Sequence, residues 1–368
     1  MLRGSAFVVP IFLILIISCQ STTSPQVENA QIRCIPNKYA QLFEISLAKN
    51  DTLLTVFGPE KKAIGLYSWG KSTHISNHSK INRGQTYVAL SAVFARMISE
   101  LQLGHLTQGV DNANYIPKDV ILSKNCASLQ TSGIVNKEAL LKLQPQITFT
   151  YLLDGRGEQE WQRLSNNEHS VVLIQSHLES HPLARAEWIR AMGWILGKPH
   201  LADSLFNTIE SNYLALKKQG KTLPNAQPVM LNLPFEGIWH IPNKSAYFTQ
   251  LLIDANFKPS WLTEGSFKGT GASSLPLENA INMIQESAVW LNLGTVKHRS
   301  EITQYDTRLE RFLSQKELRF FQNDKQLEPQ GANSYWDLGA VHPELLLHDL
   351  IQIQQHASTE ALYFYREI

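Results

Sequence analysis

The sequence has 368 residues, of which 43% are hydrophobic and 18% are charged, with 33 basic and 32 acidic side chains. This even balance of charge gives no electrostatic case for binding nucleic acid, which needs a clustered excess of Lys and Arg. The length suits two domains of ordinary size, each with enough apolar residues to build a core.

The N-terminus has the order of a secretory signal peptide. Arg3 is followed by an apolar run from Ala6 to Ile17 that is too short to span a bilayer comfortably. The run ends in Ile16-Ile17-Ser18-Cys19, which resembles the bacterial lipobox, in which the cysteine is acylated, typically with palmitate-like chains, and becomes the new N-terminus. We therefore predict a lipoprotein signal peptide over residues 1–18, a lipid anchor on Cys19, and a tether over residues 19–35.

Two further cysteines, Cys34 and Cys126, remain after Cys19. In an oxidising compartment outside the cytoplasm they could pair as a disulfide. They could equally be two separate thiols, because the sequence does not bring their Cα atoms within bridging distance. Both alternatives stay open.

Strands and helices alternate after the tether. Residues 52–57 and 63–68 have the pattern of two strands around a turn, giving a small β element within residues 50–68. The expected elements that follow are strand 86–90, helix 91–101, strand 106–110, helix 136–143, strand 146–152, helix 157–165 and strand 170–175. This alternation is typical of a parallel sheet and defines an N-terminal lobe over residues 36–180.

Residues 182–218 are helical in pattern, except at Gly197-Lys198-Pro199, where Gly can end one helix and Pro can begin the next. The second helix would be about 30 Å long and would form a stiff link between lobes. We assign residues 181–220 to linker helices. The alternation restarts with strand 228–233, helices 245–255 and 277–284, and strand 288–293, which predicts a second α/β lobe over residues 221–368.

Several segments resemble those of one protein family. They are Tyr39-Ala40, Thr52-Leu-Leu-Thr-Val56, His181-Pro-Leu-Ala-Arg185-Ala-Glu187-Trp188-Ile189, Gly237-Ile-Trp239-His-Ile-Pro242, Trp290-Leu-Asn-Leu-Gly294-Thr295 and Gly331-Ala-Asn-Ser-Tyr335-Trp336-Asp-Leu-Gly339-Ala-Val-His-Pro343. With them the chain resembles the periplasmic substrate-binding lipoproteins of iron-siderophore, haem and cobalamin ABC transporters, in the branch common in Bacteroidetes-type bacteria.

The resemblance implies an α/β fold of two Rossmann-like lobes joined by a long rigid helix, with ligand bound in the cleft between them. It implies a monomer that delivers a metal chelate to an ABC importer permease, with no catalytic residues and no cofactor of its own. Its place would be the cell envelope, facing the periplasm from either the inner or the outer membrane. The chain departs from the family pattern near residues 244–246, where an acidic residue for permease docking is missing.

Ligands of open α/β sheets bind beyond the carboxyl ends of the strands. Chelates with anionic oxygens on a partly apolar body call for guanidinium groups beside aromatic rings. The candidate ligand-binding residues in the corresponding loops are Arg185, Trp239, Tyr335, Trp336, Tyr115 and Arg156. Arg185 could instead pair with Glu187, and the two tryptophans could simply pack within a lobe.

Two other functions remain as alternatives. His177, Glu179 and His181 could bind bare zinc or manganese, but Pro182 follows directly, so the histidines lie in a loop entering a helix and a capping role is favoured. The chain could also be an envelope protein of the same fold without a transport role. An enzyme is not expected, since the sequence has no Gly-x-Ser-x-Gly, His-Glu-x-x-His or Cys-x-x-Cys motif.

Overall fold

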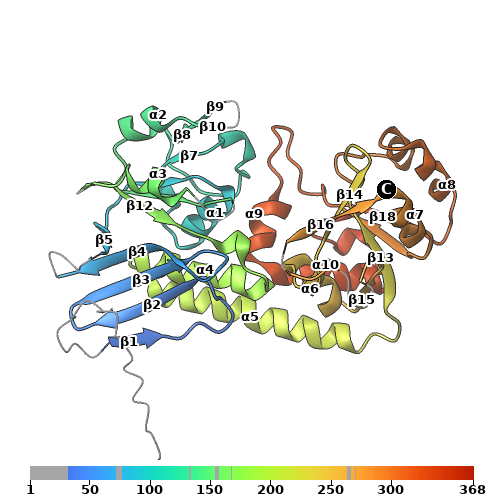
Figure 1. Ribbon diagram of the computed structural model, residues 1–368, viewed down its shortest axis with the longest axis horizontal. Helices are drawn as coiled ribbons and strands as arrows, with labels where there is room; N and C mark the ends of the chain where they lie inside the picture. Colours follow the sequence, from blue (N-terminus) through green and yellow to red (C-terminus); the bar gives the residue numbers. More distant parts are fainter. Residues whose placement is uncertain are drawn as a thin grey trace, which may run out of the picture.

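The computed structural model describes residues 32–71, 77–131, 134–153, 157–166, 168–262, 267–269 and 271–368. It shows two α/β lobes, a smaller N-terminal sheet below the first lobe, and a long helix that runs beneath both lobes (Figure 1). The predicted fold class is thereby confirmed: each lobe holds a mainly parallel sheet, and a long helix joins them. The predicted anchor, Cys19, lies outside the described residues.

The N-terminal sheet has five strands in sequence order. They are β1 (Ile32–Ile35), β2 (Phe43–Ala48), β3 (Asp51–Phe57), β4 (Ala63–Gly70) and β5 (Ser79–Lys80). The first four are antiparallel, and β5 runs parallel to β4. The strands expected at 52–57 and 63–68 are present. β1 falls inside the segment predicted as a tether. The sequence did not predict this strand, because a four-residue strand whose side chains are all at least partly exposed has no alternating hydrophobic pattern.

Two buried carboxylates attach this sheet to the first lobe. Glu187 accepts hydrogen bonds of 2.8 Å from the backbone N–H groups of residues 38–40. Glu179 accepts from those of residues 41 and 42 at 3.0 and 2.9 Å, and from Trp188 Nε1 at 3.2 Å. Two of the family-like segments, one near residue 39 and one near residue 187, are therefore in direct contact.

The first lobe is built on a five-stranded parallel sheet. Its strand order is β12 (Ser170–Leu173), β11 (Ile147–Thr150), β6 (Tyr87–Ala89), β7 (Thr107–Val110) and β8 (Ala127–Ser128). The connecting helices are α1 (Ala92–Glu100), α2 (Lys137–Lys142) and α3 (Glu158–Gln162), and β9 (Gln130–Thr131) pairs with β10 (Ile134–Val135). Ser91 and Asn136 cap α1 and α2 by accepting from backbone N–H groups.

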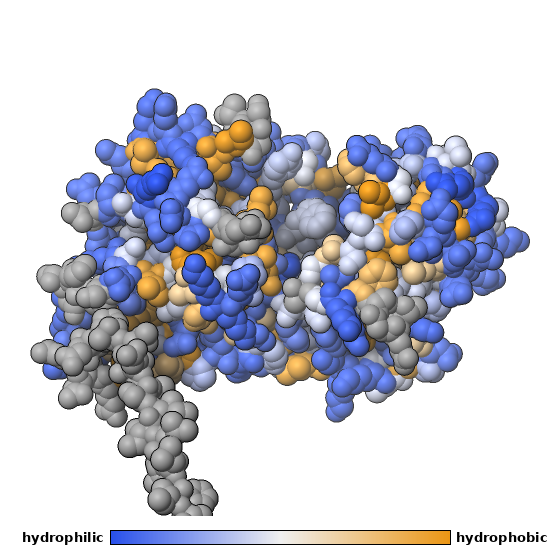
Figure 2. Space-filling view, in the orientation of Figure 1, coloured by the Kyte–Doolittle hydropathy of each residue, from blue (hydrophilic) through white to orange (hydrophobic). Residues whose placement is uncertain are grey.

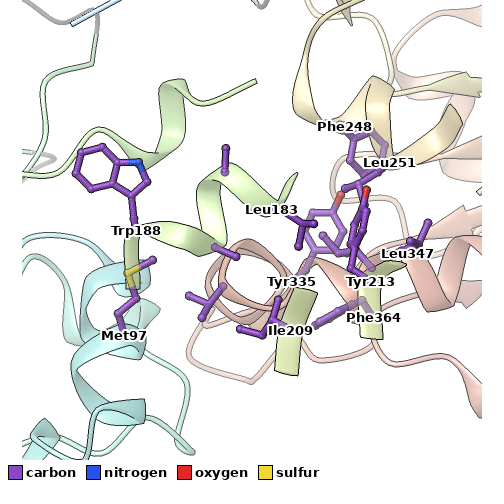
Figure 3. Packing of buried hydrophobic residues seen from close by; sticks show 14 of the residues in the cluster. Met97, Leu183, Trp188, Ile209, Tyr213, Phe248, Leu251, Tyr335, Leu347 and Phe364 are labelled. Atoms are coloured by element: carbon purple, nitrogen blue, oxygen red, sulfur yellow. The ribbon is translucent and has the colours of Figure 1, made fainter. Parts of the chain in front are cut away.

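Helices α4 (Pro182–Ile195) and α5 (Pro199–Lys221) link the lobes. His181 Nδ1 accepts a 3.1 Å hydrogen bond from Leu183 N–H, which confirms its capping role at the start of α4. The 23 residues of α5 make it about 34 Å long. Its buried side chains, among them Ile209 and Tyr213, pack beside Leu347 and Phe364 of the second lobe (Figure 3). None of the helices in the described ranges is long and apolar enough to cross a bilayer.

The second lobe repeats the layered arrangement. Its sheet has the order β15 (Phe257–Pro259), β13 (Gln227–Leu231), β17 (Val289–Leu291), β18 (Arg319–Gln322) and β19 (Arg366–Glu367), with only β19 antiparallel. A ribbon of β14 (Ile238–Pro242) and β16 (Ala272–Pro276) lies beside it. The helices are α6 (Tyr247–Asp254), α7 (Leu277–Gln285), α8 (Glu310–Leu313), α9 (Ser334–Val341) and α10 (Pro343–Gln354).

Helix α9 comes late in the chain but packs against α1 and α4 of the first lobe (Figure 1). Arg96 of α1 bonds through Nε to Asp337 Oδ2 of α9 at 2.8 Å, with 6% and 1% of these side chains exposed. The same guanidinium bonds to both oxygens of Asp119 at 2.6 and 2.9 Å. One arginine of the first lobe thus holds a helix contributed by the second part of the chain.

A second polar contact lies at the other end of α9. His342 Nε2 is 3.0 Å from Glu100 of α1, and its Nδ1 is 2.8 Å from Glu344 of α10. Burial disfavours the imidazolium, but the hydrogen bonds and charges of the two glutamates outweigh burial and raise the pKa of His342 to about 9. The two lobes are therefore joined both by α5 and by α9.

The disulfide between Cys34 and Cys126 is not formed. Both thiols are free: Cys34 is exposed and Cys126 is half-buried. Cys34 lies in β1 with its Sγ 3.4 Å from Glu44 Oε1, whereas Cys126 directly precedes β8 of the first lobe, where burial raises its pKa to about 11. The two cysteines belong to different sheets, so the sequence alternative of two separate thiols applies.

Candidate functional site

A cavity of about 450 Å³ lies between the lobes, and we call it the cleft. Figure 2 shows the molecule hollowed between its two halves. The cleft is lined by His177, Leu178, Glu179 and Arg185 of the first lobe, by residues 231–232, 240–242, 246–248, 271–272 and 292 of the second, and by Tyr335 and Trp336 of α9. Leu231 ends β13 and Asn292 follows β17, so the cleft lies beyond carboxyl ends of the second lobe's strands, where ligands of such sheets bind.

Arg185 of α4 is the arginine of the cleft. Its Nη2 donates to the carbonyl of His177 at 2.6 Å and its Nε to the carbonyl of Glu179 at 3.3 Å. The guanidinium carbon lies 3.5 Å from the centroid of the Tyr247 ring, which belongs to α6 of the second lobe. The alternative ion pair with Glu187 is not formed, because that carboxylate binds the backbone of residues 38–40.

Within the described residues Arg185 has no ion-pair partner, and the negative charge of Glu179 acts on it only from a longer distance. The partners of its guanidinium are two carbonyls and an aromatic ring. Burial lowers the pKa of Arg185, but an arginine remains charged in proteins. A half-buried cation without an ion-pair partner is unfavourable, so an anion that entered the cleft would be stabilised there.

The opposite wall is aromatic. Phe248 of α6 and Tyr335 of α9 are buried, while 65% of Trp336 is exposed. The rings of Tyr335 and Trp336 meet edge to face with centroids 4.8 Å apart. The hydroxyl of Tyr335 accepts from Asn292 Nδ2 at 3.3 Å, which fixes its ring, so Trp336 is presented to the cleft on a rigid support.

The structure corrects the prediction for Trp239. This side chain is fully buried, its Nε1 donates to the carbonyl of Leu231 at 2.7 Å, and its ring packs near Trp290. Side chains alternate along β14, so His240 faces outward into the cleft while Trp239 faces the core. Trp239 therefore packs within the lobe, which was the alternative interpretation of its sequence position.

The other candidates fall in different places. Arg185, Tyr335 and Trp336 line the cleft together. Tyr115 is 56% exposed and lies outside the cleft lining, where its ring borders Gly331. Arg156 lies outside the described residues.

Sequence reasoning missed several residues that line the cleft. Asn232 and Asn292 directly follow β13 and β17, with φ of +63° and +61°. Asn tolerates this left-handed conformation better than most residues, so an Asn at the end of each buried strand was an available signal. Tyr247 gave no signal, because an aromatic residue at the start of an apolar helix is ordinarily part of a core.

The described residues contain no group of three or more His, Cys, Asp and Glu side chains that could hold a metal ion. His177 faces the cleft, but its ring packs on Tyr151 and its Nε2 lies 3.4 Å from the carbonyl of Leu153. Burial lowers the pKa of His177, so it is neutral near pH 7. The residues proposed for a bare zinc or manganese ion therefore do not converge.

The sequence of the two lobes matches a known protein family. Residues 88–324 match a family model described as Periplasmic binding protein. No curated protein matches the sequence.

Similar solved structures include the siderophore-binding protein BauB with two acinetobactin molecules and ferric iron (13% identity, 83% of this chain and 100% of that chain, TM-score 0.55). A periplasmic heme-binding protein from Pseudomonas aeruginosa (13%, 77% and 97%, 0.55) and the periplasmic vitamin B12-binding protein BtuF of Vibrio cholerae (11%, 75% and 99%, 0.51) are also similar. At these identities the likeness shows the fold. Because the family model spans more than half of the sequence, this chain belongs to the periplasmic binding proteins, a family of substrate-binding transport proteins.

Proposed function

We propose that the protein captures a metal chelate of the ferric-siderophore, haem or cobalamin type in its cleft, holding it through an anionic group, and delivers it to an ABC importer. The observation that carries this proposal is Arg185, a cation in the cleft with no carboxylate partner in the described part of the chain. Proteins with similar folds are described as binding a ferric siderophore, heme or vitamin B12. The chelate is cargo, and the protein needs no cofactor of its own.

The geometry supports binding of an anion with a large apolar body. A guanidinium presents several N–H donors in a fixed plane and pairs with carboxylate oxygens in two-point contacts. Nε and one N–H of Nη2 of Arg185 already donate to the lobe's own carbonyls, which leaves the two N–H groups of Nη1 and the second N–H of Nη2 for the ligand. The exposed ring of Trp336 offers the flat apolar surface that a porphyrin, corrin or catecholate ring system can cover.

The proposal includes a location at the cell envelope, with the protein anchored to a membrane. Acyl chains on Cys19 would hold the folded part at a membrane surface, as expected from the lipobox-like segment. A monomer with both lobes facing one permease fits a cleft whose walls come from both halves of the chain. The absence of an acid near residues 244–246 means that the second lobe would dock through other side chains.

Titration of the chain from residue 20 onward tests the proposal. Ferric enterobactin, haemin and cyanocobalamin, which carry catecholate, carboxylate and phosphate oxygens respectively, would be added separately while tryptophan fluorescence is followed, with Trp336 as the exposed reporter. We expect saturable quenching by one of the three, smaller in amplitude in Trp336→Phe, and with the affinity weakened about tenfold or more in Arg185→Gln. Lys118→Gln serves as a control, because Lys118 is 75% exposed and lies outside the cleft lining.

No response to any of the three chelates, together with tight binding of zinc, would contradict the proposal. A response that Arg185→Gln leaves unchanged would show that the cleft is not the site.

A further inference from the structure

Positive charge is concentrated at the N-terminal end of the chain. Residues 32–82, which contain the N-terminal sheet, carry seven basic and three acidic side chains. Residues 221–368, which contain the second lobe, carry twelve basic and sixteen acidic side chains. The protein is therefore close to neutral as a whole but has a basic sheet at one end and an acidic lobe at the other.

Three of these basic side chains, Arg33, Lys49 and Lys71, lie at one end of the N-terminal sheet, whereas Lys61 and Lys62 lie in the β3–β4 turn at the other end. The register places Ile32 opposite Ala48 and Asp51 opposite Gly70, so the start of β1, the β2–β3 turn and the end of β4 share that end. A second cavity of about 450 Å³ lies there, and the charged residues in its lining are Lys49, Lys71, Arg83 and Asp51. We call this surface, with exposed Arg33 on the adjoining strand, the basic end of the sheet.

These cations are largely without protein partners. Lys49 and Lys71 are exposed, and within the described ranges the one ion pair made by a basic side chain of residues 32–82 is that of Lys38 with Glu210. Arg83 is held in place by a 2.8 Å hydrogen bond from Nη2 to the carbonyl of Trp194 and by stacking over Trp69. The basic end thus offers several positive charges to an external anion.

The chain enters the sheet at this same end. Ile32 begins β1, twelve residues after Gln20, the residue that follows the predicted acylated cysteine. Such a segment reaches at most about 45 Å when extended and about 20 Å as a flexible coil. An acyl anchor on Cys19 would therefore hold the basic end near the lipid surface, where a few basic side chains are attracted to anionic headgroups.

We propose that the basic end of the N-terminal sheet lies against an anionic membrane surface, so that the anchored protein, while it is not docked on a permease, keeps its sheet at the membrane and its second lobe away from it. This inference rests on the lipid anchor of the proposed function, and not on the identity of the chelate. Acylation and basic side chains reinforce one another in holding proteins at membranes. The acidic second lobe is repelled by the same surface, which adds to the preferred orientation.

Vesicle sedimentation of the chain from residue 20 onward tests the inference, because this chain has no acyl group to mask a weak interaction. We expect it to bind phosphatidylcholine vesicles containing phosphatidylglycerol at low salt, to leave them at high salt, and to ignore vesicles of phosphatidylcholine alone. Lys49→Glu/Lys71→Glu should lower the partition coefficient about tenfold or more. The matched control is Lys258→Glu/Lys316→Glu, which makes the same charge change at exposed positions of the second lobe.

Absence of binding to anionic vesicles at low salt, or an equal loss in both double variants, would overturn the inference. Chelate titration of Lys49→Glu/Lys71→Glu should match that of the unmodified chain, so a failure here is distinct from a failure of the proposed function.

Orientation can be measured on the acylated protein. A fluorophore on Cys34, which is exposed and lies in β1, should transfer energy to a headgroup-labelled lipid more efficiently than one on Lys316→Cys in a Cys34→Ser background. Cys126 should react little, because burial raises its thiol pKa to about 11. Equal transfer from both positions would contradict the proposed orientation.

Discussion

The two walls of the cleft differ in chemistry and in how they are supported. The first-lobe wall presents Arg185, whose guanidinium is held by two carbonyls of its own lobe. The second wall is aromatic and is presented by α6 and by α9, the helix that an arginine of the first lobe holds in place. For the proposed chelate, neither wall alone can satisfy both the charge and the apolar body. Under the proposed function, binding therefore depends on the separation of the walls, and α5 and α9 both connect the halves of the chain that carry them.

The largest effect on stability is expected from breaking the ion pair between Arg96 and Asp337, which holds α9 against the first lobe. Arg96→Gln leaves Asp337, with a 1% exposed side chain, as a buried carboxylate without its cation. We expect the free energy of unfolding to fall by about 3–5 kcal/mol, measured by urea denaturation. Burial already raises the pKa of Asp337 to about 6 despite Arg96, and the variant should raise it further.

Two controls sharpen this prediction. Arg96→Met/Asp337→Leu removes both charges and should recover most of the lost stability. Arg308→Gln breaks two surface ion pairs, with Glu278 and with Asp306, and should cost less than about 1 kcal/mol. If Arg96→Gln were no more costly than Arg308→Gln, α9 would not be held by this ion pair.

The second contact of α9 should make stability depend on pH. The folded-state pKa of His342 is raised to about 9 from its ordinary 6.5, so its contribution is fully present below pH 6.5 and is lost as the pH rises through 9. The shift corresponds to about 3 kcal/mol of unfolding free energy. His342→Gln should flatten the profile of unfolding free energy between these pH values, and an unchanged slope would rule out this histidine as its source.

The charged wall should govern affinity more than stability. Arg185→Gln removes the cation of the cleft and should weaken binding of the anionic chelate by about 1.5–3 kcal/mol, measured by calorimetric titration. Arg185→Lys keeps the charge but loses the planar donor fork and should recover only part of the affinity. Full recovery by lysine would mean that charge alone matters at this wall.

The smallest effect is expected at the aromatic wall. Trp336→Ala should weaken chelate binding by about 1 kcal/mol through lost ring contact, with little change in stability because 65% of the side chain is exposed. Trp239→Ala provides the contrast, since this fully buried ring should cost about 3–5 kcal/mol of stability. If Trp336→Ala reduced stability and Trp239→Ala reduced chelate affinity without reducing stability, the roles assigned to the two tryptophans would have to be exchanged.

Local patterns in the sequence predicted much of the fold. The alternation of strands and helices between residues 86 and 293, the cap at Ser91 and the break at Gly197 depend on neighbouring residues, and the structure has them. β1 was missed because it is short and exposed. The prediction that Trp239 lines the cleft was wrong, because the side to which a strand residue points depends on where β14 packs.

The candidate site was only partly predictable for a similar reason. Arg185, Tyr335 and Trp336 were found because guanidinium and aromatic groups have a recognisable chemistry. The contact of Arg185 with Tyr247 and the ion pair of Arg96 with Asp337 join residues that lie 62 and 241 positions apart. Such pairs follow from tertiary packing, and no periodicity in a single sequence encodes them.

The central claim is that Arg185 recognises the anionic group of the chelate while the aromatic wall holds its body. Calorimetric titration with the chelate that responds, and with a form of that chelate whose anionic group is neutralised, such as haemin dimethyl ester for haemin, tests this claim most directly. We expect the unmodified protein to prefer the anionic form by about tenfold or more, and Arg185→Gln to lose this preference. Equal affinity of the unmodified protein for both forms would contradict it.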